Sequence, residues 1–307
     1  MISDEAHQAI VVGGGVAGVS CALECFDVRV DCLLVEARNE LGGQLHEVPN
    51  SVRNLASGRF EDGAALRRSL EAAAEILGER RRLRAPVERA DLAAGWIEAG
   101  GRRLSARAFV IATGRRRRTL PAFAEGALGG DVTYQFETRR EHFLGRDAAV
   151  VGGGDSAVLD ALELAASGAR VHLLHRSPLA ARPDLVAALR NQPRIEDLED
   201  WEPESLLGPA RLAGVVAVRR GSGERRELRV GALVLKLGYA PNTEPFVGQI
   251  ALERGAVVVD ADLRTSLQHV FAAGDVIAGS YPRIASALGQ GSLAARSVLR
   301  LLSERHV

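Results

Sequence analysis

A glycine pattern that occurs twice in the chain restricts its fold more than any other feature. Val11-Val12-Gly13-Gly14-Gly15 recurs as Val150-Val151-Gly152-Gly153-Gly154, 139 positions later. In each copy an apolar run precedes the glycines, and a helix-forming segment and a second apolar run follow them. This order of strand, glycine turn, helix and strand is typical of a dinucleotide-binding βαβ unit. The chain is therefore predicted to be an α/β protein with two Rossmann-like dinucleotide-binding domains.

The expected elements are similar in length in the two copies. Apolar runs rich in Val and Leu suit parallel strands that are covered on both faces. The first copy predicts a strand over 8–12, a helix over 16–26 and a strand over 30–35. The second copy predicts a strand over 148–151, a helix over 156–166 and a strand over 170–174. A further helix is expected over 284–302.

The glycines of the first copy have separate mechanical roles. Gly13 permits a tight turn, Gly15 lets a pyrophosphate approach the backbone, and Gly18 lets the helix pack closely on the strand. The N–H groups at the start of the helix then face the phosphates. The second copy keeps the first two of these positions, as Gly152 and Gly154.

The residue that ends the second strand of each copy distinguishes the two sites. Glu36 lies 23 positions after Gly13, and His175 lies 23 positions after Gly152. A carboxylate at this place accepts hydrogen bonds from the hydroxyls of an adenosine ribose, which predicts a dinucleotide without a 2′-phosphate, such as FAD. The pair His175-Arg176 is basic at the equivalent place, and it suits the 2′-phosphate of NADP.

The overall composition excludes several other classes of protein. The 39 basic and 39 acidic residues give a net charge of zero, so no nucleic-acid partner is expected. The three cysteines cannot form a disulfide framework and have no zinc-type spacing, so no metal site is predicted and a reducing compartment, the cytoplasm, fits best. No secretory pattern and no apolar run of membrane-spanning length is visible, so no membrane partner is expected.

Several further motifs resemble those of the thioredoxin-reductase-like flavoproteins. The segment after Glu36 resembles the family's flavin-side segment, and the residues before and after the second glycine motif also match. The motifs that carry the resemblance are Leu41-Gly42-Gly43-Gln44-Leu45, Val52-Arg53-Asn54, Ile111-Ala112-Thr113-Gly114, Gly152-Gly153-Gly154-Asp155-Ser156-Ala157, His175-Arg176, Gly238-Tyr239-Ala240-Pro241-Asn242-Thr243 and Phe271-Ala272-Ala273-Gly274-Asp275.

The resemblance implies a particular domain organisation. Two Rossmann-like domains of the three-layer ββα type are expected, with the second inserted into the first. A discontinuous FAD-binding domain would comprise residues 1–115 and 243–307, and an NAD(P)-binding domain would comprise residues 116–242. The two crossings between them would act as a hinge, and the resemblance also implies a homodimer.

The resemblance also implies which residues hold the cofactors FAD and NADP. Asp275 is expected to accept hydrogen bonds from the ribityl–phosphate region of FAD, and the start of the last helix should face the flavin. The residues expected at the FAD are Gly13, Gly15, Gly18, Glu36, Gly43, Gln44, Asn54, Thr113, Gly114, Gly274, Asp275, Arg283, Ile284 and Ala285. Those expected at the NADP are Gly152, Gly154, Asp155, Ser156, His175, Arg176 and Arg182. No side chain is expected to act as a catalytic nucleophile.

One feature of thioredoxin reductases is missing. They carry a Cys-x-x-Cys redox pair shortly before the second glycine motif, and Gln135 and Thr138 fill those two positions when residues are counted back from Gly152 without gaps. A hydroxyl and an amide cannot form a redox disulfide. In this respect the chain resembles the ferredoxin–NADP and flavodoxin–NADP reductases built on the same fold. The three cysteines lie elsewhere, at Cys21, Cys25 and Cys32, and are predicted to be buried small hydrophobic residues.

The predicted function is that of an FAD-dependent NAD(P)H oxidoreductase, which passes electrons through the flavin to ferredoxin, flavodoxin or a small molecule. Three alternatives stay open: a disulfide or dithiol oxidoreductase, a flavoprotein with a different dinucleotide, such as a second FAD, in the NAD(P) site, and a flavin-binding protein without turnover. The arginines at 115–118 form a basic run, which either docks an acidic protein partner or belongs to a solvated linker.

Overall fold

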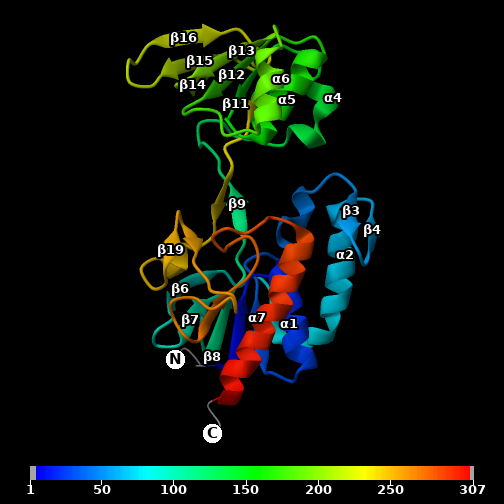
Figure 1. Ribbon diagram of the computed structural model, residues 1–307, viewed down its shortest axis with the longest axis vertical. Coiled ribbons are helices and arrows are strands. Elements are labelled where there is room, and N and C mark those ends of the chain that lie inside the picture. The colour runs from blue at the N-terminus through cyan, green and yellow to red at the C-terminus, as the bar shows by residue number, and fades with distance from the viewer. Residues whose placement is uncertain (1–4, 305–307) are drawn as a thin grey trace. The chain divides into compact units, whose positions relative to one another are not determined.

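The computed structural model describes residues 5–304 and is shown in Figure 1. The chain divides into two compact units. The first combines the residues up to Arg116 with those from Ala240 onward, and the second comprises Arg117–Tyr239. Within residues 5–304 no helix has the length and apolar character that a membrane span requires.

The first unit is built on one seven-stranded sheet. Its parallel part consists of β5 (Arg81–Arg82), β2 (Cys32–Val35), β1 (Glu5–Val12), β8 (Arg102–Ile111) and β21 (Val270–Ala272). The strands β7 (Trp96–Ala99) and β6 (Val87–Asp91) continue the same sheet in antiparallel pairing from the first half of β8. The parallel strands end at one edge of the sheet, and therefore the loops that follow them lie together.

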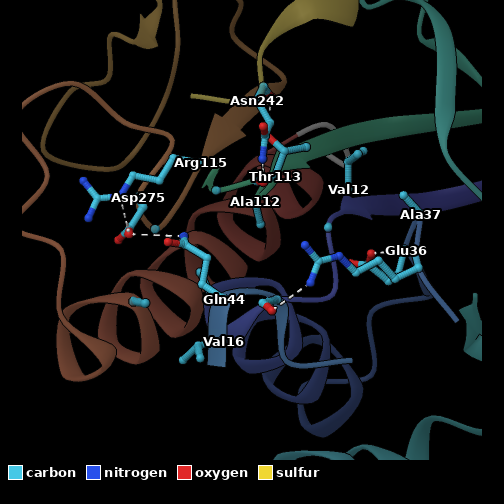
Figure 2. Close-up of a pocket in the computed structure, with 18 of the residues that line it drawn as sticks. Val12, Val16, Glu36, Ala37, Gln44, Ala112, Thr113, Arg115, Asn242 and Asp275 are labelled. Atoms are coloured by element: carbon cyan, nitrogen blue, oxygen red, sulfur yellow. Dashed lines mark hydrogen bonds and ion pairs between the residues drawn. The ribbon is translucent and has the colours of Figure 1, made fainter. Parts of the chain in front are cut away.

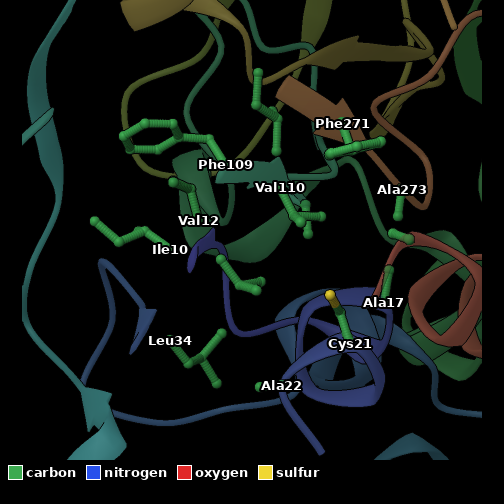
Figure 3. Close-up of a cluster of buried hydrophobic side chains, with 14 of the residues drawn as sticks. Ile10, Val12, Ala17, Cys21, Ala22, Leu34, Phe109, Val110, Phe271 and Ala273 are labelled. Carbon is green, nitrogen blue, oxygen red and sulfur yellow. The ribbon is translucent and has the colours of Figure 1, made fainter. Parts of the chain in front are cut away.

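Two helices cover one face of this sheet, and they pack against each other. They are α1 (Val16–Asp27) and α7 (Ile284–Glu304), which lie side by side in Figure 1. A Cβ atom at Gly291 would overlap the carbonyl oxygen of Ala17, so this close approach of the two helices requires a glycine. Beneath them lies a core of fully buried side chains, which includes Ile10, Phe109 and Phe271 (Figure 3).

Shorter elements complete the first unit. The helix α2 (Gly63–Ala73) begins after Asp62, whose carboxylate accepts a hydrogen bond from the Ala65 N–H at 2.7 Å. The strands β9 (Arg115–Arg117) and β18 (Tyr239–Pro241) pair with each other where the chain passes between the two units. The remaining elements are η1 (Gly43–Glu47), β3 (Val52–Leu55), β4 (Gly58–Phe60), α2 (Gly63–Ala73), η2 (Ala74–Arg80), β9 (Arg115–Arg117), β18 (Tyr239–Pro241), η4 (Glu244–Phe246), β19 (Leu252–Glu253) and β20 (Ala256–Val257).

The second unit has three layers around a parallel five-stranded sheet. The strands of that sheet follow the order β10 (Val132–Thr133), β17 (Ala232–Leu235), β11 (Ala148–Val151), β12 (Val171–His175) and β13 (Ile195–Glu199). The helices α5 (Asp155–Ala166) and α6 (Pro183–Arg190) bury apolar side chains against one face. An antiparallel sheet of β14 (Trp201–Leu207), β15 (Gly214–Arg219) and β16 (Arg225–Leu228) covers the other. Three short elements, α3 (Ala127–Gly130), η3 (Phe136–Thr138) and α4 (Arg140–Phe143), lie before β11.

The predicted fold class is confirmed, with small differences in the bounds of the elements. Each unit has an α/β sheet with parallel strands at its centre and a glycine turn after one of them. The second unit has the expected ββα layers, whereas in the first unit β6 and β7 extend the main sheet through β8. The predicted strand over 30–35 begins two residues later, at Cys32, and the predicted helix over 284–302 extends to Glu304.

Candidate functional site

The first glycine turn joins β1 to α1, and its glycines differ in what surrounds them. Gly13 has a φ of 110°, and a Cβ atom there would overlap the carbonyl oxygen of Ala112 on the neighbouring strand end. A Cβ atom at Gly18 would overlap the carbonyl oxygen of Gly13. By contrast, the nearest atom to a Cβ at Gly15 would lie 3.9 Å away. Gly13 and Gly18 are therefore required by packing within the chain, whereas Gly15 leaves room for a ligand.

Glu36, which follows β2, holds this turn in place. Its side chain is buried, with 8% of the residue exposed. One carboxylate oxygen, Oε2, accepts a hydrogen bond from the Gly14 N–H at 2.5 Å, and Oε1 accepts one from the Arg38 N–H at 2.8 Å. The sequence predicted only a ribose contact at Glu36, and this bond to the glycine turn was missed. Each carboxylate oxygen can accept a second hydrogen bond, so the two roles are compatible.

A cavity of about 470 Å³ lies where the parallel strands of the first unit end (Figure 2). Its volume falls within the range of about 300–1,000 Å³ that small-molecule and cofactor sites occupy. The loops after β1, β2, β8 and β21 meet there, which places residues distant in the sequence around one space. Of the residues predicted at the FAD, those lining the cavity are Gly13, Gly15, Glu36, Gly43, Gln44, Thr113, Gly114, Gly274, Asp275, Arg283 and Ile284.

Three residues predicted at the FAD do not line this cavity. Gly18 packs its helix against the glycine turn. Asn54 lies exposed on β3. Ala285 belongs to the first turn of α7, where its backbone rather than its side chain would be the contact. The structure therefore does not bring Asn54 together with the other predicted residues.

Asp275 follows β21 and has one hydrogen bond and one ion pair with side chains of other loops (Figure 2). The Gln44 Nε2 group donates to Asp275 Oδ2 at 3.4 Å, and Arg115 Nε lies 3.1 Å from the same oxygen. The Asp275 side chain is 18% exposed and lines the cavity. Its carboxylate is therefore anchored through Oδ2 at the wall of the cavity.

Thr113 and Asn242 join the two strand ends at which the chain leaves and re-enters the first unit. The Thr113 hydroxyl donates to the Asn242 carbonyl oxygen at 2.6 Å, and the Asn242 side-chain amide donates to the Thr113 carbonyl oxygen at 2.8 Å. The Asn242 N–H donates to the carbonyl oxygen of Gly114. Asn242 also lines the cavity. It belongs to the motif at 238–243, but the sequence did not indicate it as a site residue.

The N-terminus of α7 also borders the cavity, which Arg283 and Ile284 line. The first hydrogen bond of the helix runs from the Ala287 N–H to the Arg283 carbonyl oxygen, so the preceding N–H groups have no acceptor within the helix. A helix N-terminus carries partial positive charge and favours negative charge placed beside it. The Arg283 guanidinium adds a full charge, and it stacks on the Tyr281 ring at 4.5 Å from the centroid.

The second glycine turn, between β11 and α5, repeats the mechanics of the first. Gly152 has a φ of 141°, and a Cβ atom there would overlap the carbonyl oxygen of Lys236. Nothing lies within 4 Å of a Cβ placed at Gly154. The turn thus offers the same open position before a helix N-terminus, and these residues fit the phosphates of a dinucleotide.

Three residues predicted at the NADP lie close to this turn. Asp155 Oδ1 accepts a hydrogen bond from the Arg182 N–H at 2.8 Å, and Arg182 Nε lies 3.3 Å from Asp155 Oδ2. The guanidinium of Arg182 is also 3.7 Å from Asp184. Ser156 is exposed in the first turn of α5. Two carboxylates therefore balance much of the charge of Arg182.

His175 departs from the prediction that it contacts the NADP. The residue is 3% exposed, and its Nε2 lies 2.6 Å from Asp197 Oδ1. Its Nδ1 lies 2.8 Å from the carbonyl oxygen of Ser177. Both ring nitrogens face acceptors within the chain, which leaves neither of them to bind a phosphate. His175 therefore fixes the end of β12, and the exposed Arg176 is the basic side chain that faces solvent there.

The three cysteines are buried in the first unit, as the sequence predicted. Cys21 and Cys25 lie on α1, and Cys32 begins β2. The hydrogen bond with Cys25 and the burial of the thiol raise the pKa of Cys21 well above its ordinary value. The pKa of Cys32 is raised as well, whereas the hydrogen bonds with Cys21 and Cys32 lower the pKa of Cys25 to about 4. All three sulfur atoms are buried, so burial keeps them away from an external disulfide.

The arginine run at 115–118 is engaged within the chain rather than presented to solvent as a block. Arg115 pairs with Asp275, and Arg116 pairs with Glu244 at 2.5 Å. Arg117 donates to the carbonyl oxygen of Tyr134, and Arg118 donates to that of Tyr239 at 3.1 Å. These bonds favour the linker interpretation of the run over the docking interpretation.

Comparisons with known proteins agree with this architecture. The family model described as pyridine nucleotide-disulphide oxidoreductase matches residues 7–291. The chain is 32% identical over 302 residues to a thioredoxin reductase of Streptomyces coelicolor, covering 95% of this chain and 92% of that protein. The solved structure of Lactococcus lactis thioredoxin reductase superposes with a TM-score of 0.74 at 25% identity, covering 97% of this chain and 99% of the other.

A further relative is considerably longer than this chain. An alkyl hydroperoxide reductase protein of Pseudomonas aeruginosa is 32% identical over 305 residues. The match covers 95% of this chain but only 58% of that relative. The similarity therefore concerns the part of the longer protein that corresponds to the two units of this chain.

Proposed function

The chain belongs to the pyridine nucleotide-disulphide oxidoreductase family, and we propose that it is an FAD-dependent NAD(P)H oxidoreductase that passes electrons to an external acceptor without a redox dithiol of its own. The observation that carries the proposal is the cavity of the first unit, where a glycine turn, a buried carboxylate and two helix N-termini converge. When bound, FAD would supply the redox chemistry, as the acceptor of two electrons from a reduced nicotinamide.

We assign one dinucleotide to each unit. The discontinuous unit, residues 1–115 and 243–307 in the sequence-based division, would bind FAD, and residues 116–242 would bind the pyridine nucleotide. The open positions at Gly15 and Gly154 support this assignment, because each lies directly before a helix whose N-terminus favours a pyrophosphate.

In the first unit each residue would have a defined task. Glu36 would accept hydrogen bonds from the adenosine ribose while it holds the Gly14 N–H. Asp275, oriented by Gln44, would accept from the ribityl chain. The N-terminus of α7 would stabilise the negative charge that collects on a reduced flavin, because the helix dipole and Arg283 both present positive charge there.

In the second unit we propose a modest preference for NADPH. Arg176 is exposed at the end of β12, where the adenosine ribose of a dinucleotide lies, and can form a forked contact with a 2′-phosphate. His175 is occupied by Asp197 and the Ser177 carbonyl, and Arg182 is balanced by Asp155 and Asp184. One basic side chain therefore provides most of the preference.

We propose that the acceptor is a small redox protein, with ferredoxin or flavodoxin favoured over a disulfide substrate. The positions that Cys-x-x-Cys occupies in thioredoxin reductases hold Gln135 and Thr138 here. The near full-length match to a thioredoxin reductase supports a small redox protein as the acceptor class. The homodimer and the cytoplasmic location stay predictions from the sequence, and light scattering on the purified protein tests the first.

Anaerobic stopped-flow absorbance tests the proposal. The purified protein is mixed with NADPH or NADH, and the flavin band at about 450 nm is followed. We expect rapid bleaching with NADPH, slower bleaching with NADH, and rapid recovery when oxidised ferredoxin or flavodoxin is added. A protein purified without flavin, or a flavin that neither nucleotide bleaches, would refute the oxidoreductase assignment. Bleaching without recovery by any acceptor would favour a flavin-binding protein without turnover.

A thiol–disulfide oxidoreductase is the second candidate, because relatives of nearly equal length are thioredoxin reductases. Any such chemistry would have to use the three buried cysteines. Replacement of Cys21, Cys25 and Cys32 by alanine should leave flavin reduction and acceptor turnover unchanged, with the thermal midpoint as the control for folding. Loss of turnover with retained flavin and unchanged stability would show that a cysteine takes part.

A further inference from the structure

Lys236 is the only lysine among the 39 basic residues of the chain, and its side chain is buried between two carboxylates of the second unit. Its Nζ lies 2.7 Å from Glu137 Oε1 and 3.1 Å from Asp160 Oδ2. The side chains of Lys236 and Asp160 are each 8% exposed, whereas that of Glu137 is 37% exposed. We call these three residues the lysine cluster; one edge of it, at Glu137, reaches solvent.

The charges of the lysine cluster do not balance. Two carboxylates and one ammonium give a net charge of minus one when all three are ionised. Asp160 Oδ2 is buried and, despite the nearby Lys236 Nζ, accepts no well-aligned hydrogen bond. An incompletely satisfied buried carboxylate is costly for a protein to maintain, which favours a functional role over a purely structural one.

The protonation of Asp160 is sensitive to its surroundings. Burial raises the pKa of Asp160 to about 6, Lys236 opposes this rise, and Glu137 and Glu163 add to it. Glu163 lies on the same helix and is paired with Arg140 at 2.7 Å. Burial also favours the neutral form of Glu137. The hydrogen bond from Lys236 and the charge of Arg117 favour its ionised form more strongly, so the pKa of Glu137 is lowered. The cluster therefore changes from a net charge of minus one to zero as the pH falls through about 6.

The position of the lysine cluster in the sheet indicates which part of a dinucleotide it faces. Lys236 directly follows β17, and η3 with Glu137 lies shortly after β10. In the order β10-β17-β11-β12-β13, these two strands lie on one side of β11, and β12 with its ribose-side Arg176 lies on the other. A dinucleotide binds across the carboxyl ends of such a sheet, with its two halves on opposite sides of the central strand.

The backbone of Lys236 also contacts the phosphate-binding turn. Its N–H donates to the Val151 carbonyl oxygen, and its own carbonyl oxygen occupies the space of a Cβ at Gly152. The lysine cluster is thus joined to the glycine turn on the side away from the adenosine. A ligand that extends from the turn across β17 would meet the exposed edge of Glu137.

On this geometry we propose that Glu137, Lys236 and Asp160 form the nicotinamide end of the second dinucleotide site and set its preference between oxidised and reduced nicotinamide. The inference rests on the proposed function, because it requires a pyridine nucleotide in the second unit. The oxidised nicotinamide ring carries a positive charge and the reduced ring carries none. A cluster of net charge minus one therefore favours the oxidised ring, and a neutral cluster does not.

Ligand binding measured by calorimetry tests this inference on the flavin-loaded protein. The probes are NADP⁺, the 1,4,5,6-tetrahydro analogue of NADPH, which cannot donate a hydride, and 2′-phospho-ADP-ribose, which lacks the nicotinamide. The preference is the dissociation constant of the reduced analogue divided by that of NADP⁺. For one unit charge near the ring, we expect the preference to fall by about fivefold to tenfold between about pH 8 and about pH 5.

Two variants remove the net charge in different ways. Asp160→Asn leaves Glu137 with Lys236, a pair that is neutral across this pH range. Glu137→Gln leaves Asp160 with Lys236; this pair is neutral at about pH 8 and becomes positive as the buried Asp160 is protonated. In Asp160→Asn we expect the low preference of the native protein at about pH 5 to hold at both pH values. In Glu137→Gln we expect this low preference already at about pH 8, and a further fall toward about pH 5 as the cluster becomes positive. Affinity for 2′-phospho-ADP-ribose should stay unchanged. Glu137 is partly exposed, so its replacement should be tolerated even if that of Asp160 impairs folding.

Glu204→Gln is the matched control, because Glu204 pairs with Arg225 on the antiparallel sheet of the same unit. It should behave as the native protein. A native-like, pH-dependent preference in both cluster variants would overturn the inference, as would an equal loss of affinity for the nicotinamide-free probe. If the native protein binds none of the three probes, the proposed function fails, and this inference fails with it.

Discussion

Replacement of Glu36 by glutamine probes both roles of this carboxylate at once. In the native chain its two oxygens accept backbone hydrogen bonds from Gly14 at 2.5 Å and from Arg38 at 2.8 Å. Glutamine has the same length but carries one oxygen and one NH₂ group. One of the two backbone donors would therefore face another donor in a site that is 8% exposed.

The expected cost has two parts. Loss of one charge-assisted hydrogen bond inside the chain should lower the free energy of unfolding of the flavin-free protein by about 1.5–3 kcal/mol. Loss of the charged contact to the adenosine ribose should weaken FAD binding by a similar free energy, which corresponds to about tenfold to a hundredfold in the dissociation constant. Only the first part would be present without FAD.

Two measurements separate these parts. Urea unfolding of the flavin-free protein reports the free energy of unfolding, and the recovery of flavin fluorescence on dissociation reports the FAD dissociation constant. Glu40→Gln is the control, since Glu40 lies in the same segment and pairs with Arg67 at 2.8 Å on the surface. An FAD affinity that changes no more than in this control would refute the ribose contact. An unchanged stability of the flavin-free protein would refute the role of Glu36 in holding the turn.

Three further changes test other parts of the structure. Gly15→Ala should change the stability of the flavin-free protein by no more than about 1 kcal/mol, because the new Cβ meets no close atom, yet it should reduce FAD retention on gel filtration. Gly18→Ala should instead lower the thermal midpoint, because its Cβ would overlap a carbonyl oxygen. Arg176→Ala should raise the NADPH dissociation constant by about tenfold to a hundredfold and leave that of NADH unchanged by calorimetry, whereas equal effects would contradict a 2′-phosphate contact. Burial of Asp131 favours its neutral form, but the Arg146 hydrogen bond opposes burial, and together with the Leu212 N–H and His142 it lowers the pKa of Asp131 to about 2. The ionised carboxylate therefore stabilises the folded state by about 2–3 kcal/mol above about pH 4, and this stability is lost as the pH falls toward about 2. Acid unfolding of Asp131→Asn should lack this pH dependence.

Much of the fold is determined by local features of the sequence. Gly13 and Gly152 adopt positive φ values after apolar runs, and such turns are recognisable because few other residues adopt that conformation. The helices that follow are helix-forming segments of ordinary length, and Val- and Leu-rich runs mark the parallel strands around them. Most residues predicted at the FAD consequently line one cavity, since parallel strands deliver their following loops to the same edge.

The exceptions are residues whose neighbours come from elsewhere in the chain. Asn54 matched a motif, but β3 places it in solvent rather than at the cavity. Whether a polar side chain on a short strand points inward depends on the packing of that strand, and a motif of three residues does not contain this information. His175 was predicted to contact a phosphate, but Asp197 on the next strand occupies its ring.

The sequence by itself therefore determined two glycine turns, two parallel sheets and the carboxylate that ends one second strand. Only the tertiary structure decided that Glu36 also holds the Gly14 N–H, and that Lys236 lies between Glu137 and Asp160. The physical reason is that a turn or an apolar run is determined by a few residues adjacent in the sequence. An ion pair depends instead on the burial of its two groups and on the distance at which the fold places them. Lys236 and Glu137 are 99 positions apart in the chain, and the pairing of β10 with β17, together with the turn of η3 after β10, brings them within 2.7 Å.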